Sequence, residues 1–528
     1  MPEFAAIDYA VIALYILGII ACGLWVGRGE RGTEDYFLAG RNLPWYLIGF
    51  SLFASNMSGA SFVGLMGASY SHGMVVYNYE WTATLVLIVF ALFMLPVFLR
   101  ARLVTVTEYL ELRFDRRARW AYALFTILTI MFIDTAGALF AGSVVIGILF
   151  PGSSLWLTSI LLALAAGGYT IFGGLRAVVV TDAVQAVLMI FGAALILYFG
   201  LEQVGGWDAL MTRLDAAEKQ LIKPVDDAFL PWPGIFGVIL LGFYYWSLNQ
   251  YFVQRALGAR SLEDGRKGAL FGGLLKLPNV FLMVIPGMIA IVLFPDLEQP
   301  DQVFPLLAFE VLPIGLRGLI LAALLAAIMS SLDSALNAAS SLLTMDFIRP
   351  LRPQMSDRAL LTTGRIATAV LMAAAACYAP LIERFGSLFS YFQSTLAYLV
   401  PPIVAVYLAG LFSRRATATG AFWAIASAFL LGLPLFLVKE ATGLWSRIGL
   451  PEVHFTYMSI ALFAVALAIL ALAGRAEAVG KGSAAEAMVF RRSDLQPGTA
   501  GVGRLLADAR LHAAGLAVLL AAAVTVFW

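Results

Sequence analysis

The chain contains 528 residues, of which 61% are hydrophobic and 13% are charged. Soluble domains carry roughly 25% charged residues, so this composition excludes an ordinary soluble protein and predicts that much of the chain faces lipid. Lysine plus arginine (34) nearly balances aspartate plus glutamate (33), which argues against a nucleic-acid partner. The two cysteines, Cys22 and Cys377, lie in apolar runs and predict neither a disulfide framework nor a metal centre.

The first apolar run covers residues 7–27 and begins beside Glu3 and Asp8, with no basic residue before it. Cleaved signal peptides start with a basic region, so we expect this run to be retained. A helix of its length reaches roughly 31 Å, which is enough to cross the core of a bilayer. The run is therefore predicted to be the first transmembrane helix.

Thirteen further apolar stretches follow it, and the expected fold class is an all-α membrane protein with about fourteen transmembrane helices. The predicted spans are 7–27, 44–72, 77–99, 120–150, 155–173, 177–201, 233–254, 268–294, 315–344, 363–380, 386–411, 416–438, 453–473 and 511–528. Segment 474–510 is predicted to be a cytoplasmic linker or an amphipathic segment. The polar loop 202–231 has mixed charge and could carry a short external helix.

The basic residues are divided unevenly between alternate loops. One set of loops, together with the ends of the adjoining spans, contains 26 lysines and arginines, the other contains 7, and Lys276 lies inside a span. Because basic loops stay in the cytoplasm, the first set is predicted to be cytoplasmic and both termini to lie outside.

A short polar cluster at residues 54–61, Ala-Ser-Asn-Met-Ser-Gly-Ala-Ser, interrupts the second apolar stretch. A helix in lipid can leave its backbone groups unpaired only where they face a cavity or an ion. Such an interruption early in a polytopic chain indicates the binding site of a transporter.

Ionisable residues at membrane depth are costly and therefore informative. Four acids and one base lie near or within predicted spans, and the surplus negative charge could be neutralised by a bound cation. Alternatively, Glu80 and Asp182 lie only a few residues inside their spans and could reach the interface. The five residues are Glu80, Asp134, Asp182, Lys276 and Asp333.

The ninth span contains Ser330, Asp333 and Ser334 at helical spacing, with Ser331 beside them. Hydroxyl, carboxylate and carbonyl oxygens are the ligands that a small hard cation prefers. Serines in transmembrane helices also often bond back to carbonyls of their own helix. Three serines and an acid within five positions nevertheless favour an ion site.

Several segments, in this order along the chain, resemble the sodium/solute symporter family, and within it the sodium/glucose or galactose cotransporters. The resemblance covers residues 8–412 and weakens through the last three spans. The segments that carry it are residues 33–41 (TEDYFLAGR), 53–56 (FASN), 79–81 (YEW), 105–110 (TVTEYL), 173–182 (GGLRAVVVTD), 254–255 (QR), 275–277 (LKL) and 343–346 (LTMD).

The resemblance implies a LeuT-like core of two inverted five-helix repeats with the site at the midplane. The division it implies is a first helix and cytoplasmic loop at 1–43, a first repeat at 44–201, an extracellular loop at 202–232, a second repeat at 233–412 and accessory C-terminal helices at 413–528. The second repeat should be broken near residues 242–250, where the sequence itself indicates a break only weakly.

The family's main sodium site implies backbone carbonyls of three residues and the hydroxyls of two serines. These match Ala54, Met57, Ala327, Ser330 and Ser331, with Asp182 behind them. In members with a second sodium ion, the matching residues are Asp182, Ser330, Asp333 and Ser334. Asp333 stands where relatives often have a hydroxyl, so it could strengthen a second sodium site or bind a proton.

For the sugar, the resemblance implies an acid, an amine and an amide around an aromatic ring. The matching residues are Ser61, Glu80, Lys276 and Gln393, with Tyr245 as an inner gate and Tyr79 and Phe389 toward the outside. Ser61, Ala83 and Gly242 depart from the galactose-binding pattern, and Asp134 stands where related chains carry an amide or a base. We therefore expect a sugar pocket whose preference differs from that of the best-known members.

The expected function is sodium-coupled import of a sugar such as glucose or galactose by alternating access, with one or two sodium ions. The expected location is the bacterial inner membrane, as a multi-pass integral protein, and no enzymatic activity is expected. Alternative solutes are an inositol, an acidic sugar, a carboxylate or an amino acid. A passive channel and a membrane sensor are the alternatives from other classes.

Overall fold

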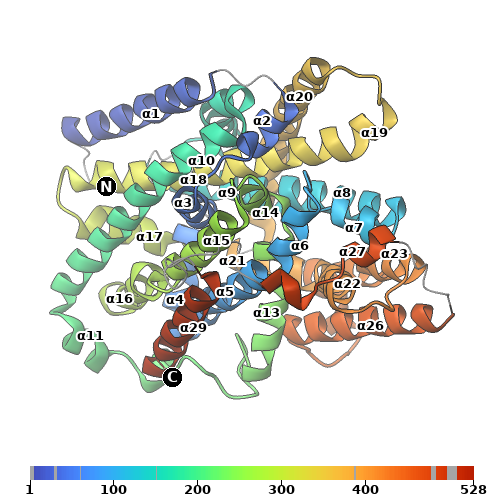
Figure 1. Ribbon diagram of the computed structural model, residues 1–528. Helices are drawn as coiled ribbons and strands as arrows, with labels where there is room; N and C mark the ends of the chain where they lie inside the picture. The colour runs from blue at the N-terminus through green and yellow to red at the C-terminus, as the bar shows by residue number, and fades with distance from the viewer. Residues whose placement is uncertain are drawn as a thin grey trace.

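The computed structural model describes residues 5–28, 32–59, 61–149, 152–385, 388–476, 483–495 and 508–527. These residues form helices and no strands; only two isolated backbone bridges occur among them, Leu43 with Ala259 and Lys223 with Pro231. The prediction of an all-α protein is confirmed. The helices pack into one body, in which α1 (Ala6–Val26) lies at the edge beside α10 (Leu155–Val204) and α18 (Leu316–Leu342) (Figure 1).

Ten helical segments among the described residues are long and apolar enough to cross a membrane, or eleven if the bent pair Phe392–Leu399 and Pro401–Phe412 forms one span. The remaining three of the fourteen predicted spans do not form separate segments of this kind among the described residues. They are α3 (Trp45–Asn56), the apolar helix Leu155–Leu164 and the segment Trp232–Leu248, while α4 (Met66–His72) belongs to the long segment Ser61–Arg100. Interruption of the backbone explains the difference at α3 and at Trp232–Leu248. Residues 165–173, which complete the predicted span 155–173, belong to α10, but their side chains lie outside the described residues.

The other elements of the predicted spans form the body around α18. Their bounds are α5 (Asn78–Val89), α6 (Leu95–Arg100), α8 (Arg116–Thr129), α9 (Ala136–Leu149), α13 (Ile235–Phe243), α14 (Gln250–Leu257), α15 (Leu262–Lys276), α16 (Ile285–Leu293), α20 (Asp357–Tyr378), α21 (Leu388–Leu399), α22 (Pro401–Phe412), α23 (Ala418–Ser427), α24 (Leu433–Phe436), α26 (Phe455–Ala476) and α29 (Ala509–Val526).

Helix α10 consists of two helices joined at Gly174, whose φ of +51° is unfavourable for residues with a side chain. This position separates the predicted spans 155–173 and 177–201. Two short helices, α11 (Trp207–Arg213) and α12 (Ala216–Lys219), follow it in the loop that was predicted to carry one.

Two helices are interrupted in the interior. The first is α3, which ends at Asn56; the chain then leaves helical geometry at Met57 and resumes with a π-helical turn at Ser61–Leu65. The second is α13, which continues as a π-helical turn at Tyr244–Leu248 and breaks at Asn249, where the backbone is extended. The Asn249 side chain then accepts a hydrogen bond from the backbone N–H of Tyr251 and caps α14. Both expected interruptions are therefore present, and Ala60, within the first of them, lies outside the described residues.

Helix α18 is buried along most of its length and begins against α1. The carboxylate of Asp8, on α1, is completely buried and accepts hydrogen bonds from the backbone N–H groups of Gly315 (3.1 Å) and Gly318 (2.7 Å). Unpaired N–H groups at the start of a helix attract such a negative charge. Asp8 thus fixes the start of α18 to the first helix.

Part of the predicted linker 474–510 is ordered against the helices. A short helix, α27 (Ser483–Ala487), contacts α7 (Glu108–Arg113), and a turn at Arg492–Leu495 follows. Asp494 in that turn forms an ion pair with Arg100, and its carbonyl accepts a hydrogen bond from Arg266 (2.5 Å). Residues 477–482 and 496–507 of the linker lie outside the described residues.

Candidate functional site

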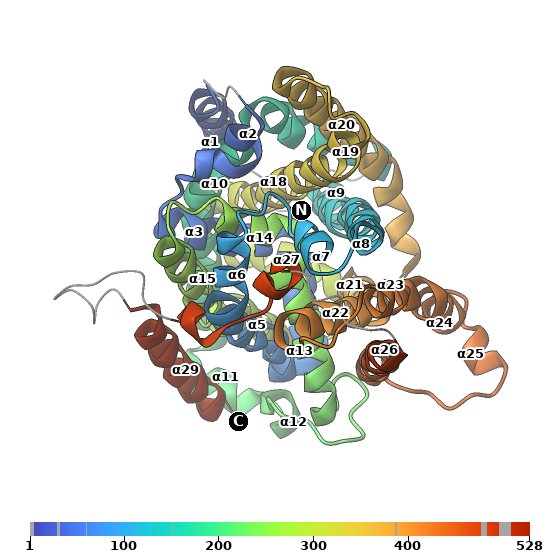
Figure 2. The same cartoon turned by 45° about the vertical axis from the view of Figure 1, so that its right-hand side comes forward.

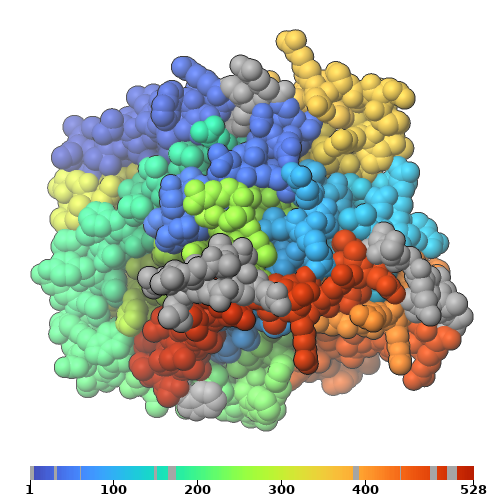
Figure 3. Space-filling view, viewed as in Figure 1, coloured from blue at the N-terminus to red at the C-terminus, as the bar shows by residue number. Residues whose placement is uncertain are grey.

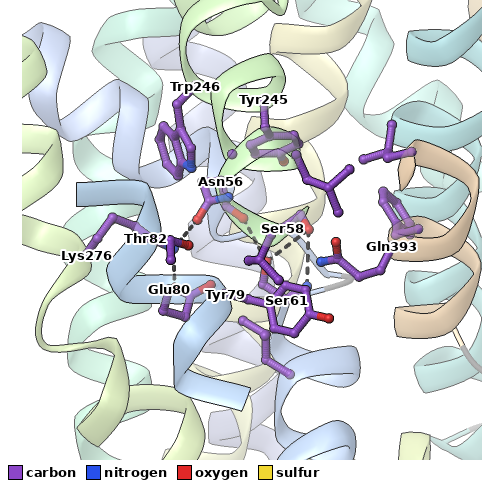
Figure 4. Close-up of a pocket in the computed structure, with 16 residues that line it drawn as sticks. Asn56, Ser58, Ser61, Tyr79, Glu80, Thr82, Tyr245, Trp246, Lys276 and Gln393 are labelled. Carbon is purple, nitrogen blue, oxygen red and sulfur yellow. Dashed lines mark hydrogen bonds and ion pairs between the residues drawn. The ribbon is translucent and has the colours of Figure 1, made fainter. Parts of the chain in front are cut away.

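A cavity of about 120 Å³ lies between the two interrupted helices (Figure 4). Its wall is formed by the end of α3, the two π-helical turns, α5, α13, α15 and α21, so residues far apart in sequence meet there. Polar side chains line one part of it and apolar ones the rest. The lining residues are Asn56, Ser58, Ser61, Leu65, Tyr79, Glu80, Thr82, Val238, Leu241, Gly242, Tyr245, Trp246, Lys276, Phe392, Gln393 and Leu396.

Glu80 and Lys276 form an ion pair in the wall of the cavity, and their side chains are only 7% and 1% exposed. Lys276 also donates a hydrogen bond to the Asn56 side chain, and Asn279 donates one to Glu80. Figure 4 shows Asn56 and Glu80 converging on the lysine. A buried ion pair is tolerated only when its remaining hydrogen-bonding groups are satisfied, and Asn56 and Asn279 provide this here.

Aromatic rings form another part of the wall. Tyr245 packs against Phe252 (4.6 Å between ring centroids) and Trp246 (5.7 Å), and the Lys276 ammonium lies 5.5 Å from the Trp246 ring. Figure 4 shows Tyr245 and Trp246 together on one side of the cavity and Tyr79 on the other. This arrangement offers an apolar face beside charged and amide groups, which is the combination that a solute rich in hydroxyls can use.

Ser61 lies at the interruption of the first broken helix. Its hydroxyl donates to the backbone carbonyl of Asn56 (2.7 Å), and its N–H lies 3.2 Å from the Ser58 hydroxyl. The serines thus replace part of the helical hydrogen bonding that is lost at the interruption. They also place side-chain oxygens at the cavity wall.

Six of the seven predicted solute residues line this one cavity: Ser61, Tyr79, Glu80, Tyr245, Lys276 and Gln393. The side chain of Phe389, the seventh, lies outside the described residues. Thr82, and not Ala83, faces the cavity from α5. Asn56 and Trp246 belong to the wall although they were not predicted; Asn56 lay in the polar cluster, whereas nothing in the sequence distinguished Trp246 from a packing residue.

The predicted main ion residues lie where α3 ends against the middle of α18. Ala54, Met57 and Ala327 are completely buried there. The Ser331 hydroxyl donates to the carbonyl of Ala327 (2.9 Å), one turn earlier in α18, and lies 3.3 Å from the carbonyl of Ser55. Ser331 therefore bonds back to its own helix and also reaches α3, so it brings the oxygens of both helices together.

Asp182, on α10, lies at the centre of a second group of oxygens. It accepts hydrogen bonds from Ser330 (2.6 Å) and Ser51 (2.5 Å), and Ser334 contacts Ser55 (2.9 Å between their hydroxyl oxygens). Asp333, which lies on α18 with Ser330 and Ser334, is also completely buried. The residues expected for a second ion are thus buried in one region.

Arg255 on α14 was counted as a loop charge, but its side chain is buried in this same group. The guanidinium lies 3.1 Å from Asp182 and donates to the hydroxyls of Ser51 (2.6 Å), Ser55 (2.7 Å) and Ser334. Sequence reasoning missed this because Arg255 directly follows a span, which is where cytoplasmic arginines are expected. Only the fold of the second interrupted helix turns it inward.

Asp134 lies in a π-helical turn at Ile130–Thr135 and does not line the cavity. One of its carboxylate oxygens is 3.5 Å from the Tyr251 hydroxyl, and Tyr251 in turn packs against Tyr245 (6.1 Å between centroids). Asp134 is therefore separated from the cavity by the aromatic wall.

The sequence model of the sodium:solute symporter family matches residues 36–427, about three quarters of the chain. The chain belongs to the sodium:solute symporter family. Symporters move solutes without changing them, which agrees with the expectation that the chain is a transporter and not an enzyme.

Individual relatives of this symporter are also similar over most of their length. Sodium/glucose cotransporter 1 of Ovis aries is 34% identical over 517 residues, covering 88% of this chain and 78% of that protein. The sodium/glucose cotransporter of Vibrio parahaemolyticus is 34% identical over 467 residues, covering 81% of this chain and 86% of that protein.

Among solved structures, a Na⁺-coupled sialic acid symporter in a substrate-bound outward-open state superimposes with a TM-score of 0.79 at 23% identity. The match covers 90% of this symporter and 99% of that chain. The nucleobase-cation-symport-1 family transporter Mhp1 has a TM-score of 0.56 at 14% identity, covering 86% and 97%. These similarities confirm the LeuT-like fold class; the exact repeat boundaries stay a prediction.

Proposed function

We propose that this protein imports a sugar together with sodium by alternating access. The observation that carries the proposal is the position of the cavity beside the contact between α3 and α18. The interrupted helix contributes Asn56, Ser58 and Ser61 to the cavity and Ser55 to the contact with Ser331. A cation bound at that contact would therefore act directly on the helix that lines the solute site.

The sodium site is proposed at the carbonyls of Ala54, Met57 and Ala327 with the hydroxyls of Ser330 and Ser331. In support, Ser331 already lies within 3.3 Å of carbonyl oxygens from both helices. Hard oxygen ligands of this kind suit a small alkali cation. A second ion is proposed at Asp182, Ser330, Asp333 and Ser334, where Arg255 supplies the positive charge in this structure. The number of ions, one or two, decides how steeply transport depends on sodium.

The solute is proposed to be a hexose such as glucose or galactose. Relatives with 34% identity carry the name sodium/glucose cotransporter. Glu80, Lys276 and Gln393 offer acceptors and donors to hydroxyl groups, and Tyr245 offers a ring face. An anionic solute is disfavoured because the charge of Lys276 is already balanced by Glu80.

The mechanism depends on a higher affinity of sodium for the outward-open state than for the inward-open state. Sodium bound between α3 and α18 favours the outward-open state, and sugar binding then allows the gates to exchange. One charge crossing 100 mV yields about 2.3 kcal/mol, and a tenfold gradient adds about 1.4 kcal/mol. Together, roughly 3.7 kcal/mol sustains about a 500-fold sugar gradient for each coupled ion.

The protein is proposed to lie in the bacterial inner membrane with both termini outside. The unequal loop charges support this orientation, because one set of alternate loops and adjoining span ends contains 26 basic residues, Arg255 among them, and the other contains 7. Cysteine labelling of the first and last residues from the outside of whole cells tests it.

The deciding experiment is uptake of radiolabelled hexoses, inositols and acidic sugars into proteoliposomes of the purified chain. We expect accumulation of a hexose with sodium outside and none above background when potassium replaces it. Equal flux in both ions would instead describe a passive channel. Accumulation of an acidic sugar alone would keep the sodium site and replace the solute.

A further inference from the structure

A second hollow in the surface lies between the C-terminal helix α29 and the pair formed by α3 and α15. It has a volume of about 640 Å³ and a mainly apolar lining. Figures 1 and 2 show α29 on the outside of the helical body, where it contacts α15 and α5. Figure 3 shows the dark red atoms of α29 at the surface of the molecule. We call this hollow the α29 groove.

The floor of the α29 groove is rigid. Helices α3 and α15 approach so closely that a Cβ at Gly49 would lie 2.4 Å from the Phe271 ring. Phe271 in turn packs edge-on against Trp45, with 5.3 Å between the ring centroids. Helix α29 rests on α15 at Gly273, where a Cβ would lie 3.2 Å from Leu516. The helices around the groove are therefore closely packed, and the groove does not result from loose packing between them.

The polarity of the α29 groove changes along its length in the same way on both helices. Lys267 on α15 and His512 on α29 line one end, and Leu274 and Leu519 lie seven residues further along each helix. Seven residues correspond to about 10.5 Å of helix. The two helices run in the same direction here, because Asp508, before α29, interacts electrostatically with Arg266 on α15, and Leu516, eight residues later, lies beside Gly273, seven residues after Arg266. The groove thus has one basic end and one apolar end.

The basic end carries a lysine that has no acidic partner among the described residues. Arg510 pairs with Asp508 and Arg260 pairs with Asp264 near this end, whereas Lys267 forms no ion pair within the described part of the chain. Trp45, 39% exposed, lies beside it. Tryptophan and basic residues together are typical of the interface between lipid and water.

We propose that the α29 groove binds one anionic glycerophospholipid. Its phosphate contacts Lys267 and His512, and one acyl chain lies against Leu274 and Leu519. Basic pockets between transmembrane helices on the cytoplasmic side recognise such head groups. The loop charges place this end of α15 and α29 on the cytoplasmic side, so the lipid belongs to the inner leaflet. A protein helix bound in the groove would make apolar contacts only, and it would not pair with Lys267.

This inference does not depend on the sugar or the ion, because the α29 groove and the cavity have no lining residue in common. It nevertheless has a consequence for transport. Helix α15 carries Lys267 in the groove and Lys276 in the cavity wall, and α29 also contacts α5, which carries Glu80. A lipid in the groove supports the two helices that hold the Glu80–Lys276 ion pair.

The test is native mass spectrometry of the full chain in detergent, titrated with phosphatidylglycerol or with phosphatidylcholine of the same acyl chains. We expect one phosphatidylglycerol to bind about tenfold more tightly than phosphatidylcholine, as one to two basic contacts provide. The double substitution Lys267→Ala with His512→Ala should reduce phosphatidylglycerol binding to the phosphatidylcholine level. Arg352→Ala, which removes an exposed basic residue elsewhere, is the matched control.

A second variant blocks the groove without touching a charge. Gly515 lines the groove, and a Cβ there would meet no atom within 4 Å, so Gly515→Phe adds a ring at a position with open space. We expect it to abolish binding of both lipids at this site. Gly18→Phe on α1, where a Cβ also meets nothing, is the control for adding an exposed ring.

The proposal is overturned if phosphatidylglycerol and phosphatidylcholine bind the wild-type chain equally, since the basic end would then not distinguish an anionic head group from a neutral one. It is also overturned if Leu519→Cys forms a disulfide-linked dimer in membranes that phosphatidylglycerol does not suppress, because a second copy would then occupy the groove. Both measurements are made without transport, so neither outcome depends on the sugar or the ion.

Discussion

Arg255 and Asp182 form an ion pair in the centre of the protein, with 3.1 Å between guanidinium and carboxylate and at most 1% of either side chain exposed. The pair joins α14, which follows the second interruption, to α10. Serines of α3 and α18 contact the same two residues. One buried charge pair therefore connects both interrupted helices with the helix that carries the proposed ion ligands.

Replacing one member of this pair should destabilise the protein strongly. Arg255→Ala leaves the Asp182 carboxylate buried without its cation, which typically costs about 3–5 kcal/mol. We expect a clearly lower Tm of the detergent-solubilised protein, measured by the loss of monodisperse protein after heating. Arg117→Ala, which removes a largely exposed partner of Asp115, should leave Tm nearly unchanged. Equal Tm values for the two variants would contradict a structural role for the buried pair.

Ser331→Ala should abolish sodium-stimulated uptake while the protein still folds. The hydroxyl donates to the carbonyl of Ala327 (2.9 Å) and lies 3.3 Å from the carbonyl of Ser55, and losing these contacts costs only about 1 kcal/mol. The loss of a cation ligand is the larger effect. Uptake into proteoliposomes with and without sodium measures it, and Ser427→Ala, a buried serine that bonds back within α23, is the control. Undiminished sodium stimulation in Ser331→Ala would remove this serine from the site.

Lys276→Ala and Gln393→Ala should both weaken sugar binding at saturating sodium, but only the first should also lower stability. Removing Lys276 leaves the buried Glu80 carboxylate without its cation, with a hydrogen bond from Asn279 still in place. Removing Gln393 leaves no buried charge without a partner. Sugar affinity from uptake kinetics and Tm from heating separate the two effects.

The double variant Glu80→Gln with Lys276→Met completes this test. We expect it to be more stable than Lys276→Ala, because no buried charge remains unpaired. If the double variant has a Tm as low as that of Lys276→Ala, the lower stability does not come from the unpaired charge of Glu80. Unchanged sugar affinity in both single variants would move the solute site elsewhere.

Asp8→Ala should lower stability by about 1–2 kcal/mol, because the N–H groups of Gly315 and Gly318 lose their acceptor. Asp8→Asn keeps an acceptor oxygen and should lose less. The measurement is Tm of the purified variants. Since α18 carries Ser330 and Ser331, we also expect Asp8→Ala to weaken the dependence of Tm on added sodium, and an unchanged dependence would confine Asp8 to a local role.

The amino-acid sequence by itself indicated the membrane character, the positions of the apolar spans and the first interruption, because these depend on residues close together in the chain. It also indicated the main polar residues of the cavity wall and Tyr245, since an ordered series of short segments carried the resemblance to a family. Six of the predicted solute residues line one cavity for this reason. The sequence signal at Asn249 was too weak to locate the second interruption, because one asparagine after an apolar run is compatible with a continuous helix.

The tertiary structure alone decided which charges meet. Arg255 reads as a loop residue, yet it pairs with Asp182, 73 residues away, because the interrupted helix turns it inward. Asp8 is expected to be an acid at the start of a span, yet it caps α18 by accepting a hydrogen bond from Gly315, 307 residues later. Periodicity and composition describe a helix and its environment, but the partner of a buried charge depends on how distant helices pack. Desolvation makes that partner decisive, because a charge removed from water is tolerated only beside a compensating group.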